Sequence, residues 1–393
     1  MPNRPTALLL TVTIVLPIFP CFANLDIYCL NVGQGDSTLV VSSSGKSLLI
    51  DGGPNDPAAS VVVPFLRSLG LASLDYTVAT CYDPDHIGGL DEVGLSEFRP
   101  ETAYDRGGGA SDNAFLNYYV ALVSRRRTLS SGQVLDLGAG VTATCHCING
   151  ELSDGFAFDL ENERDRSVGL LIEWEDFDFW ISGDLGGGGA TSFDMESEVA
   201  YLVGDVDVLR VNRHGGGESS NEIFLNELRP EVSIISVGPS NPSGDPAQEV
   251  LDRLAEFGSF QRIVQTTPGA GGSNNSVLVA DDHIHIHVTP SKYRVTGGPV
   301  DFEIPLLVER NPPDYNFNLT VEASDLLLFL KAFGTGKGAA DLDEDEQSDS
   351  DDLFLFASEW RAVTLVPTLT PTRTATRTRT PTRTATPNST DTR

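Results

Sequence analysis

The sequence has 393 residues, of which 40% are hydrophobic, so it is long enough for one large domain with a buried core and a small second unit. It carries 56 acidic against 26 basic side chains, a formal net charge of −30. An acidic surface repels the phosphate backbone of nucleic acid. The composition therefore excludes a basic nucleic-acid-binding face, and nucleic acid is expected only as a substrate of a local site.

The N-terminus has the pattern of a secretion signal. Arg4 precedes an apolar stretch from Ala7 to Phe19, which is too short to span a bilayer well. We interpret residues 1–23 as a signal peptide, with a lipoprotein anchor at Cys21 as the alternative. Since no other segment is long and apolar enough to cross a membrane, the mature chain is expected without a transmembrane segment, secreted or at the cell surface.

Four cysteines remain after such a cleavage: Cys29, Cys81, Cys145 and Cys147. An even number in an exported protein permits disulfides. Cys145 and Cys147 are two residues apart on an expected strand, so they face the same side and would pair with each other poorly. The pairing stays open.

Apolar runs and helical patterns alternate along residues 24–297. Strands are expected near residues 26–31, 38–41, 47–50, 76–80, 168–181 (two strands), 206–211, 231–237 and 263–265. Helices are expected over residues 58–69 and 113–127, the second ending in three arginines that favour the helix dipole. This mixture predicts an α/β class, with two sheets and outer helices.

The strongest chemical signal is the segment TCYDPDHIGG, residues 80–89, at the end of an expected strand. It offers Cys81, Asp83, Asp85 and His86 as metal ligands. Carboxylate and imidazole are good ligands for Zn²⁺ or Mn²⁺, and two glycines let the backbone turn tightly behind them. A polar loop with one capping aspartate is the alternative.

Two further strand ends carry ligand chemistry. WISGD ends in Asp184, and VLRVNRHGG contains His214. Alone, each would be an ordinary capping or polar residue. Three strand ends of this kind together predict a shared metal site, because residues at strand ends meet on one edge of an α/β fold.

Five motifs in order resemble the ComEC-type (competence protein) metallo-β-lactamase domains. The opening NVGQGDS and LLIDGG, residues 31–37 and 48–53, is similar to the start of those domains. The T-H-x-D-x-D-H-x-G-G, T/S-G-D, V-x-H-H-G-S and N-x-x-G-H-P motifs resemble residues 80–89, 182–184, 211–216 and 241–246. The resemblance covers residues 24–297 approximately and implies an αββα sandwich.

The resemblance also implies a site that binds one or two ions, Zn²⁺ or Mn²⁺. Its implied metal ligands are Asp83, Asp85, His86, Asp184, which would bridge two ions, and His214. Asp51 would support the site from behind. Such ions lower the pKa of a bound water, and Asp85 is expected to orient it as the catalytic residue. The implied function is an exported hydrolase of a phosphodiester or similar anionic substrate.

Three residues depart from the family pattern. Cys81 stands in place of the first histidine of the loop, and as a thiolate it can still bind Zn²⁺. Arg213 replaces the first histidine of the H-H pair, cannot bind a metal, and is predicted to clamp an anionic substrate. Asp245 replaces the histidine of G-H-P and is predicted to face the substrate as an acceptor. A non-catalytic binding protein with a degenerate metal site is therefore the alternative function.

Three more histidines, His283, His285 and His287, alternate along an expected strand and face one side of it. That spacing is compatible with a metal ion. We favour a solvated strand face, because the segment lies far along the chain from the other motifs.

Residues 298–312 are predicted to be a linker, or a closing segment of the domain, before a repeat at residues 313–362. Oxygen-bearing residues recur at loop positions 1, 3, 5, 9 and 12: Asp314, Asn316, Asn318, Glu322 and Asp325, then Asp341, Asp343, Asp345, Asp349 and Asp352. Such loops bind Ca²⁺, although Leu319 and Glu346 replace the usual glycine. The repeat resembles the small α-helical, EF-hand-like units of dockerins, which implies a cohesin-like or cell-surface partner. The Thr/Pro/Arg-rich residues 363–393 are predicted to be disordered.

Overall fold

The computed structural model describes residues 23–55, 60–256 and 262–306, together with residue 330. The predicted signal peptide, calcium-binding repeat and C-terminal tail lie outside the described residues, apart from Ala23 and residue 330. Those assignments stay predictions.

The first of two large sheets joins the two ends of the domain. Its strands follow the order β18-β17-β16-β1-β2-β3-β4-β5-β6. The bounds are β1 Leu25–Cys29, β2 Thr38–Ser42, β3 Ser47–Ile50, β4 Tyr76–Val78, β5 Thr102–Asp105, β6 Arg126–Thr128, β16 Ile284–Thr289, β17 Lys292–Gly297 and β18 Val300–Pro305. The pairs from β3 to β6 are parallel, and all others are antiparallel.

The second sheet has the order β15-β14-β13-β12-β11-β10-β8-β7, with β9 paired to β8. The bounds are β7 Val134–Asp136, β8 Thr142–Ile148, β9 Glu151–Leu152, β10 Gly169–Trp174, β11 Phe177–Ile181, β12 Val208–Arg210, β13 Val232–Ile235, β14 Arg262–Gln265 and β15 Val277–Val279. The pairs from β11 to β15 are parallel. Parallel strands place their carboxyl ends on one edge, where the predicted motifs lie.

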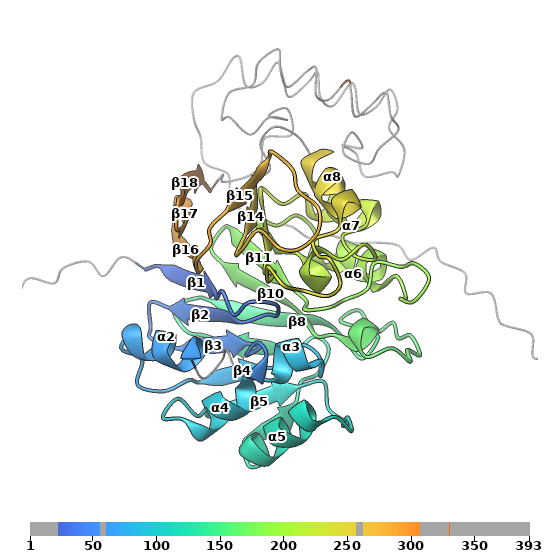
Figure 1. The fold of residues 1–393 in the computed structure, drawn as a ribbon. Coiled ribbons are helices and arrows are strands. Elements are labelled where there is room, and N and C mark those ends of the chain that lie inside the picture. Colours follow the sequence, from blue (N-terminus) through green and yellow to red (C-terminus); the bar gives the residue numbers. More distant parts are fainter. Residues whose placement is uncertain (1–22, 56–59, 257–261, 307–329, 331–393) are drawn as a thin grey trace, which may run out of the picture.

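Helices cover the outer faces of both sheets (Figure 1). They are α2 Val62–Ser68, α3 Pro84–Ile87, α4 Leu90–Leu95 and α5 Asn113–Leu122 on the first sheet, and α6 Met195–Val203, α7 Glu222–Leu228 and α8 Gln248–Glu256 on the second. One apolar core lies between the sheets and includes Ile27 and Phe179, and two more lie beneath the helices. The αββα sandwich predicted from the sequence is confirmed.

Two boundary predictions are wrong. The helix predicted over residues 113–127 ends at Leu122, and the last two of its terminal arginines, Arg126 and Arg127, lie in β6 instead. The ion pair that Arg126 makes with Asp105 of the neighbouring strand stabilises this arrangement. The predicted linker is wrong for Val300–Pro305, which pairs with β17 as strand β18. Val300 is buried there and the following residues are more exposed in alternation, as expected for an edge strand.

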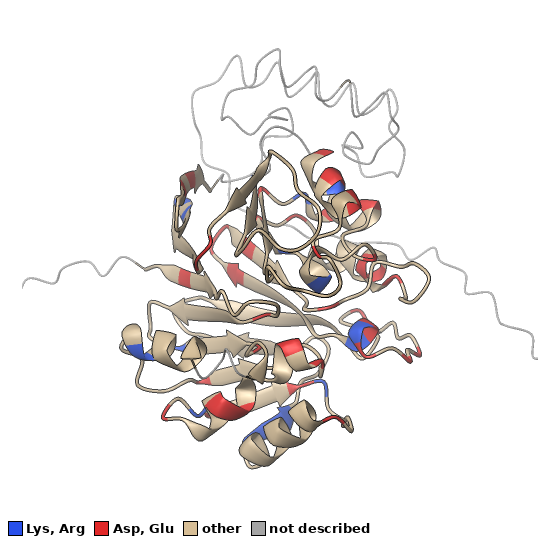
Figure 2. Ribbon diagram, in the orientation of Figure 1, with Lys and Arg blue, Asp and Glu red and all other residues tan. Residues whose placement is uncertain are grey.

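The four cysteines within the described residues are all buried and free, so none of them forms a disulfide. Cys145 and Cys147 both lie on β8, as expected, and the more exposed His146 separates them. None of the described helices has the length and apolar composition that crossing a membrane requires. Figure 2 shows Asp and Glu on the helices of both outer layers, in line with the acidic composition.

Candidate metal centre

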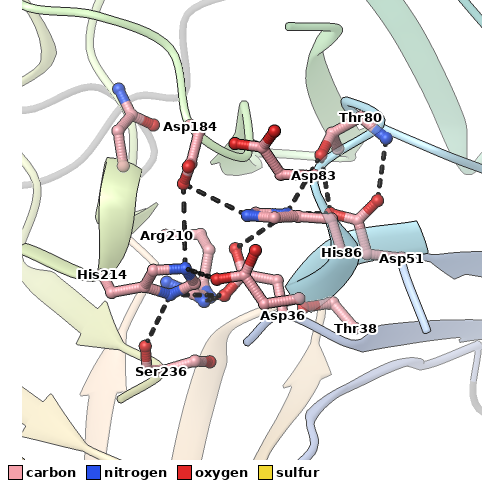
Figure 3. Close-up of polar contacts among 12 residues, drawn as sticks. Asp36, Thr38, Asp51, Thr80, Asp83, His86, Asp184, Arg210, His214 and Ser236 are labelled. Carbon is pink, nitrogen blue, oxygen red and sulfur yellow. Dashed lines mark hydrogen bonds and ion pairs between the residues drawn. The ribbon is translucent and has the colours of Figure 1, made fainter. Parts of the chain in front are cut away.

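The predicted ligands come from three distant segments and meet at the carboxyl ends of the strands (Figure 3). Asp85 and His86 lie on α3, which begins shortly after β4 with Pro84 in its first turn, a position where proline favours helix initiation. Asp184 follows β11, and His214 lies on the short 3₁₀ helix Asn212–Gly215 (η2) after β12. The fold therefore brings together the residues that the motifs had singled out.

The side chains approach one another closely. Oδ1 of Asp184 lies 3.1 Å from Nε2 of His86 and 3.8 Å from Nε2 of His214. Oδ2 of Asp85 lies 3.1 Å from the same nitrogen of His214. One ligand atom from each of Asp85, His86 and His214 lies within 4.8 Å of the others. Two carboxylates and two imidazoles thus converge on one small volume.

The ring of His86 is held from behind by Asp51. Oδ2 of Asp51 lies 2.9 Å from Nδ1 of His86, and Asp51 itself accepts hydrogen bonds from the backbone N–H and the hydroxyl of Thr80, at 2.7 and 2.6 Å. With a proton on Nδ1, the lone pair of Nε2 points toward Asp184. The structure therefore places Asp51 where a supporting carboxylate is expected.

His214 is oriented by a different set of contacts. Its Nδ1 donates to the backbone carbonyl of Ser236 at 3.0 Å and lies 3.2 Å from Oδ1 of Asp36. The backbone of His214 is in the left-handed region, with φ of 54°, a strained conformation that is frequent at functional sites. Burial lowers the pKa of His214, but Asp36 and Asp85 outweigh it and raise the pKa to about 10.

Sequence reasoning missed Asp36, Arg210 and the carbonyl of Ser236. Asp36 is buried, forms an ion pair with the buried Arg210 of β12, and lies within 3.9 Å of His86. Two signals in the sequence pointed to this pair. Asp36 is the acidic residue of NVGQGDS, and Arg210 is a lone charge inside the apolar run VLRV, where a charge needs a partner.

The residues present fit a divalent cation. Among the described residues, Nε2 of His86, Oδ1 of Asp184 and Oδ2 of Asp36 are buried polar atoms without a hydrogen-bond partner. The first two lie 3.1 Å apart and satisfy each other only while His86 is protonated, whereas a bound cation would satisfy both. Imidazole and carboxylate are the ligand types that Zn²⁺ and Mn²⁺ accept.

Arg164, which sequence reasoning also missed, lies beside this cluster on the 3₁₀ helix Arg164–Arg166 (η1). Its Nε lies 3.1 Å from Oδ2 of Asp83 and 3.3 Å from Oδ2 of Asp184. Asp184 therefore presents one oxygen to the imidazoles and the other to a guanidinium. No motif marked Arg164, because it lies in the mixed-charge run ENERDRS, which is typical of a solvated surface.

Cys81 and Asp83 are less closely gathered. Cys81 is fully buried, and burial raises the pKa of its thiol. Burial and the nearby Asp184 also raise the pKa of Asp83. Within the described ranges, neither residue belongs to a group of three ligand atoms inside 4.8 Å. Their roles as ligands stay predictions.

The two predicted substrate residues also lie near the site. The guanidinium of Arg213 contacts Glu218, with Nη1 3.3 Å from Oε2. Asp245 is buried, and its backbone N–H donates to Asn241 at 2.7 Å. Burial raises the pKa of its carboxyl, an effect that the positive charge of His214 opposes. Contact of either residue with a substrate stays a prediction.

Fold and site together define a class of protein. Residues 30–143 match the family model described as the metallo-beta-lactamase superfamily. Those residues include the Asp83–His86 loop and Asp51, while Asp184 and His214 lie beyond the match. This part of the chain is thus similar to that superfamily, and the strand ends carry a candidate metal site.

The similar curated proteins include a ComE operon protein, a recombination protein and a competence protein, ComA of Neisseria gonorrhoeae. The chain is 28% identical over 270 residues to ComE operon protein 3 of Bacillus subtilis (strain 168), covering 62% of this chain and 32% of the relative. It is 25% identical over 242 residues to Recombination protein 2 of Haemophilus influenzae (strain ATCC 51907 / DSM 11121 / KW20 / Rd), covering 58% and 26%. This chain thus spans a third or less of those relatives. Among solved structures, a diphosphatase from the PhnP family aligns with a TM-score of 0.37 at 12% identity, covering 68% of this chain and 98% of that one.

Proposed function

We propose that this chain is an exported metal-dependent hydrolase that acts on a phosphodiester or similar anionic substrate. The convergence of Asp85, His86 and His214 with Asp184 carries this proposal. Nucleic acid is a possible substrate only if it reaches the site locally, because the acidic surface would repel the rest of a long polyanion.

We further propose that the site holds one ion, Zn²⁺ or Mn²⁺, through Asp85, His86, Asp184 and His214. When bound, such an ion acts as a Lewis acid and lowers the pKa of a bound water. The chain keeps the ligands in place: Asp51 fixes the ring of His86, and the carbonyl at residue 236 fixes that of His214.

Asp85 and Arg164 are the residues of this site that face solvent most. Their side chains are 32% and 46% exposed, against 5% or less for His86, Asp184 and His214. A substrate arriving from solvent would therefore meet them first. Asp85 would accept the proton of the attacking water, and Arg164 would bind an anionic oxygen of the substrate.

Arg164 would also take the place of a second ion. Its guanidinium pairs with Asp83 and Asp184, the two carboxylates that an ion near Cys81 would need. Arginine stays protonated in proteins, so this positive charge is permanent. A fixed cation next to a single metal ion can stabilise the charge that develops on a phosphoryl oxygen.

The test uses the purified chain with Zn²⁺ or Mn²⁺ and bis(p-nitrophenyl) phosphate as a generic diester. We expect hydrolysis, and we expect Asp85→Ala to lower kcat/KM by about a thousand-fold. Asp91→Ala, which removes a half-buried carboxylate from the adjacent α4, is the matched control and should keep the activity. A chain without bound metal, or one that binds metal and is inert toward phosphate, carboxylate and sulfate esters, would support the non-catalytic alternative instead.

The calcium-binding repeat at residues 313–362 would attach this hydrolase to a cohesin-like or cell-surface partner. The support for it is the repeated spacing of oxygen ligands, since these residues lie outside the part that the structure describes. Ca²⁺ binding by the full chain, compared with an Asp341→Ala/Asp343→Ala variant, tests it. Equal binding by both proteins would contradict the assignment.

A further inference from the structure

A second group of metal-ligand side chains lies on the first sheet, outside the candidate hydrolase site. β1 and β16 pair antiparallel, with Asp26 directly opposite His287 and Tyr28 opposite His285. The intervening residues of both strands, such as Ile27 and Ile286, are buried in the core between the sheets. Strand alternation therefore places the aspartate and both histidines together on the face that points away from the core.

The three side chains already touch. Oδ1 of Asp26 lies 2.8 Å from Nε2 of His285 and 2.7 Å from Nδ1 of His287. All three ligand atoms lie within 4.8 Å of one another. In a tetrahedral zinc site with bonds of about 2.0 Å, ligand atoms lie about 3.3 Å apart, so small side-chain rotations would open room for the ion.

We propose that Asp26, His285 and His287 form a second divalent-cation site, selective for Zn²⁺ or a similar transition metal. Two imidazoles and one carboxylate make a three-ligand set that leaves one tetrahedral position for water. The side chains are 20%, 33% and 42% exposed, so an ion can enter and keep that water. The proposal does not depend on the hydrolase site.

Neighbouring side chains hold two of the ligands in place. The ring of Tyr28 stacks on that of His285, with centroids 4.3 Å apart and planes 13° from parallel. Tyr28 in turn packs edge-on against Phe65 of α2. The amide of Asn24 donates to the second carboxylate oxygen of Asp26 at 2.6 Å. Supporting contacts of this kind orient metal ligands and are a regular part of metal sites.

The charged residue that β17 places opposite His287 does not oppose the binding of an ion at Asp26, His285 and His287. Arg294 of β17 lies opposite His287 in the register, but its guanidinium makes an ion pair with Asp301 of β18 at 2.6 Å. The third histidine of the run is used otherwise, because Nδ1 of His283 accepts a hydrogen bond from the backbone N–H of Asn31 at 2.9 Å. Under this proposal, His285 and His287 are metal ligands rather than part of the solvated strand face that the sequence analysis favoured.

An ion here would link the first strand of the domain to one of its last. Asp26 and His285 are 259 residues apart in sequence, so an ion would cross-link distant parts of the chain. An ion that binds the folded chain and not the unfolded one stabilises the fold in proportion to the logarithm of its concentration. We therefore assign the site a structural role.

The test uses the full chain carrying Asp85→Ala and His214→Ala, which removes ligands from the hydrolase site. Zinc content after desalting and thermal unfolding with and without Zn²⁺ are measured in this background. We expect about one zinc per chain and a Tm that rises by about 5 °C at a Zn²⁺ concentration of about 100 Kd. Adding His285→Ala and His287→Ala should abolish both effects.

The matched control is His146→Ala, which removes a half-buried histidine of β8 that contacts Ser153. It should keep the bound zinc and the Tm shift. If the double histidine variant does not fold, Asp26→Asn keeps the shape of the side chain and should weaken zinc binding at least ten-fold. Equal zinc content and equal Tm shifts in the background protein and in both site variants would overturn the proposal.

Discussion

Replacing Arg164 by alanine tests whether this guanidinium does the work of a second metal ion. The substitution removes the positive charge that lies 3.1 Å from Asp83 and 3.3 Å from Asp184. Since the side chain is 46% exposed, its loss leaves no cavity in the core, and we expect the fold and the bound ion to persist. The loss should appear in catalysis.

The expected fall in kcat/KM can be calculated from the position of Arg164. Two unit charges about 4 Å apart interact by about 4 kcal/mol near a protein surface and by about 1 kcal/mol in bulk water. A half-exposed guanidinium lies between these limits, so we take about 2 kcal/mol for its interaction with the charge on a phosphoryl group. Because about 1.4 kcal/mol corresponds to a factor of ten, kcat/KM should fall about thirty-fold.

The assay compares Arg164→Ala, Arg164→Lys and Arg213→Ala on a phosphodiester, with the metal content of each. Lysine keeps the charge and should recover part of the activity. The side chain of Arg213 is 12% exposed, whereas that of Arg164 is 46% exposed and borders the ligand Asp184, so the loss of Arg213 should cost less. A fully active Arg164→Ala would refute a catalytic role for Arg164. If the wild-type protein binds two ions and both are lost when Asp85 and His214 are replaced, Arg164 does not take the place of a second ion.

Three other outcomes are expected. Asp51→Asn should lower metal affinity by about ten-fold or more, because it weakens the contact that orients the ring of His86. Competition with a chelator measures this affinity, and an unchanged value would contradict the supporting role of Asp51. Because the proposed single ion leaves Cys81 out of its ligands, Cys81 should react slowly with a thiol reagent at a rate that a chelator leaves unchanged, whereas acceleration by the chelator would support the sequence prediction that Cys81 is a ligand. Arg210→Leu should lower the free energy of unfolding by about 3 kcal/mol, because it leaves the carboxylate of Asp36 buried without its partner. Urea titration measures this loss, and a value under about 1 kcal/mol would show that the ion pair contributes little to stability.

The layered fold could be predicted because its signals are local. Runs such as LLIEW and FDFWI, joined by a short polar turn, form β10 and β11 nearly as expected. The errors fall where tertiary contacts decide. The arginines after α5 could equally end a helix, and only the neighbouring strand with Asp105 makes them part of β6. The strand at Val300–Pro305 forms by pairing with β17, and a local sequence pattern does not indicate that pairing.

The residues of the candidate site also fall into two groups, those that the sequence predicts and those that only tertiary contacts reveal. Asp85, His86, Asp184 and His214 stand in recognisable motifs at strand ends, so their convergence could be predicted. Arg164 could not, because it sits among charges that look like an ordinary surface. Its position depends on the path of the segment between β9 and β10, which is set by packing rather than by spacing.

The charged side chains around the site already form pairs, apart from those at its centre. Asp36 is matched by Arg210, and Asp83 by Arg164. Each pair removes a carboxylate from the set that an ion would have to neutralise. In a low-dielectric interior an unmatched charge is costly, so the carboxylates that remain unmatched determine how much positive charge the site needs.

Two carboxylates, Asp85 and Asp184, face the ligand nitrogens at the centre, while Asp51 lies behind His86 and accepts hydrogen bonds from Thr80. One divalent ion with two neutral imidazoles balances their charge. In its absence Asp85 and Asp36 raise the pKa of His214 to about 10 against the effect of burial, so a proton partly fills the same need. A second divalent ion would add two positive charges beside a guanidinium that cannot lose its own, and would have to displace it from both carboxylates it contacts. The contacts of Arg164 with Asp83 and Asp184 therefore favour a single ion with an arginine beside it.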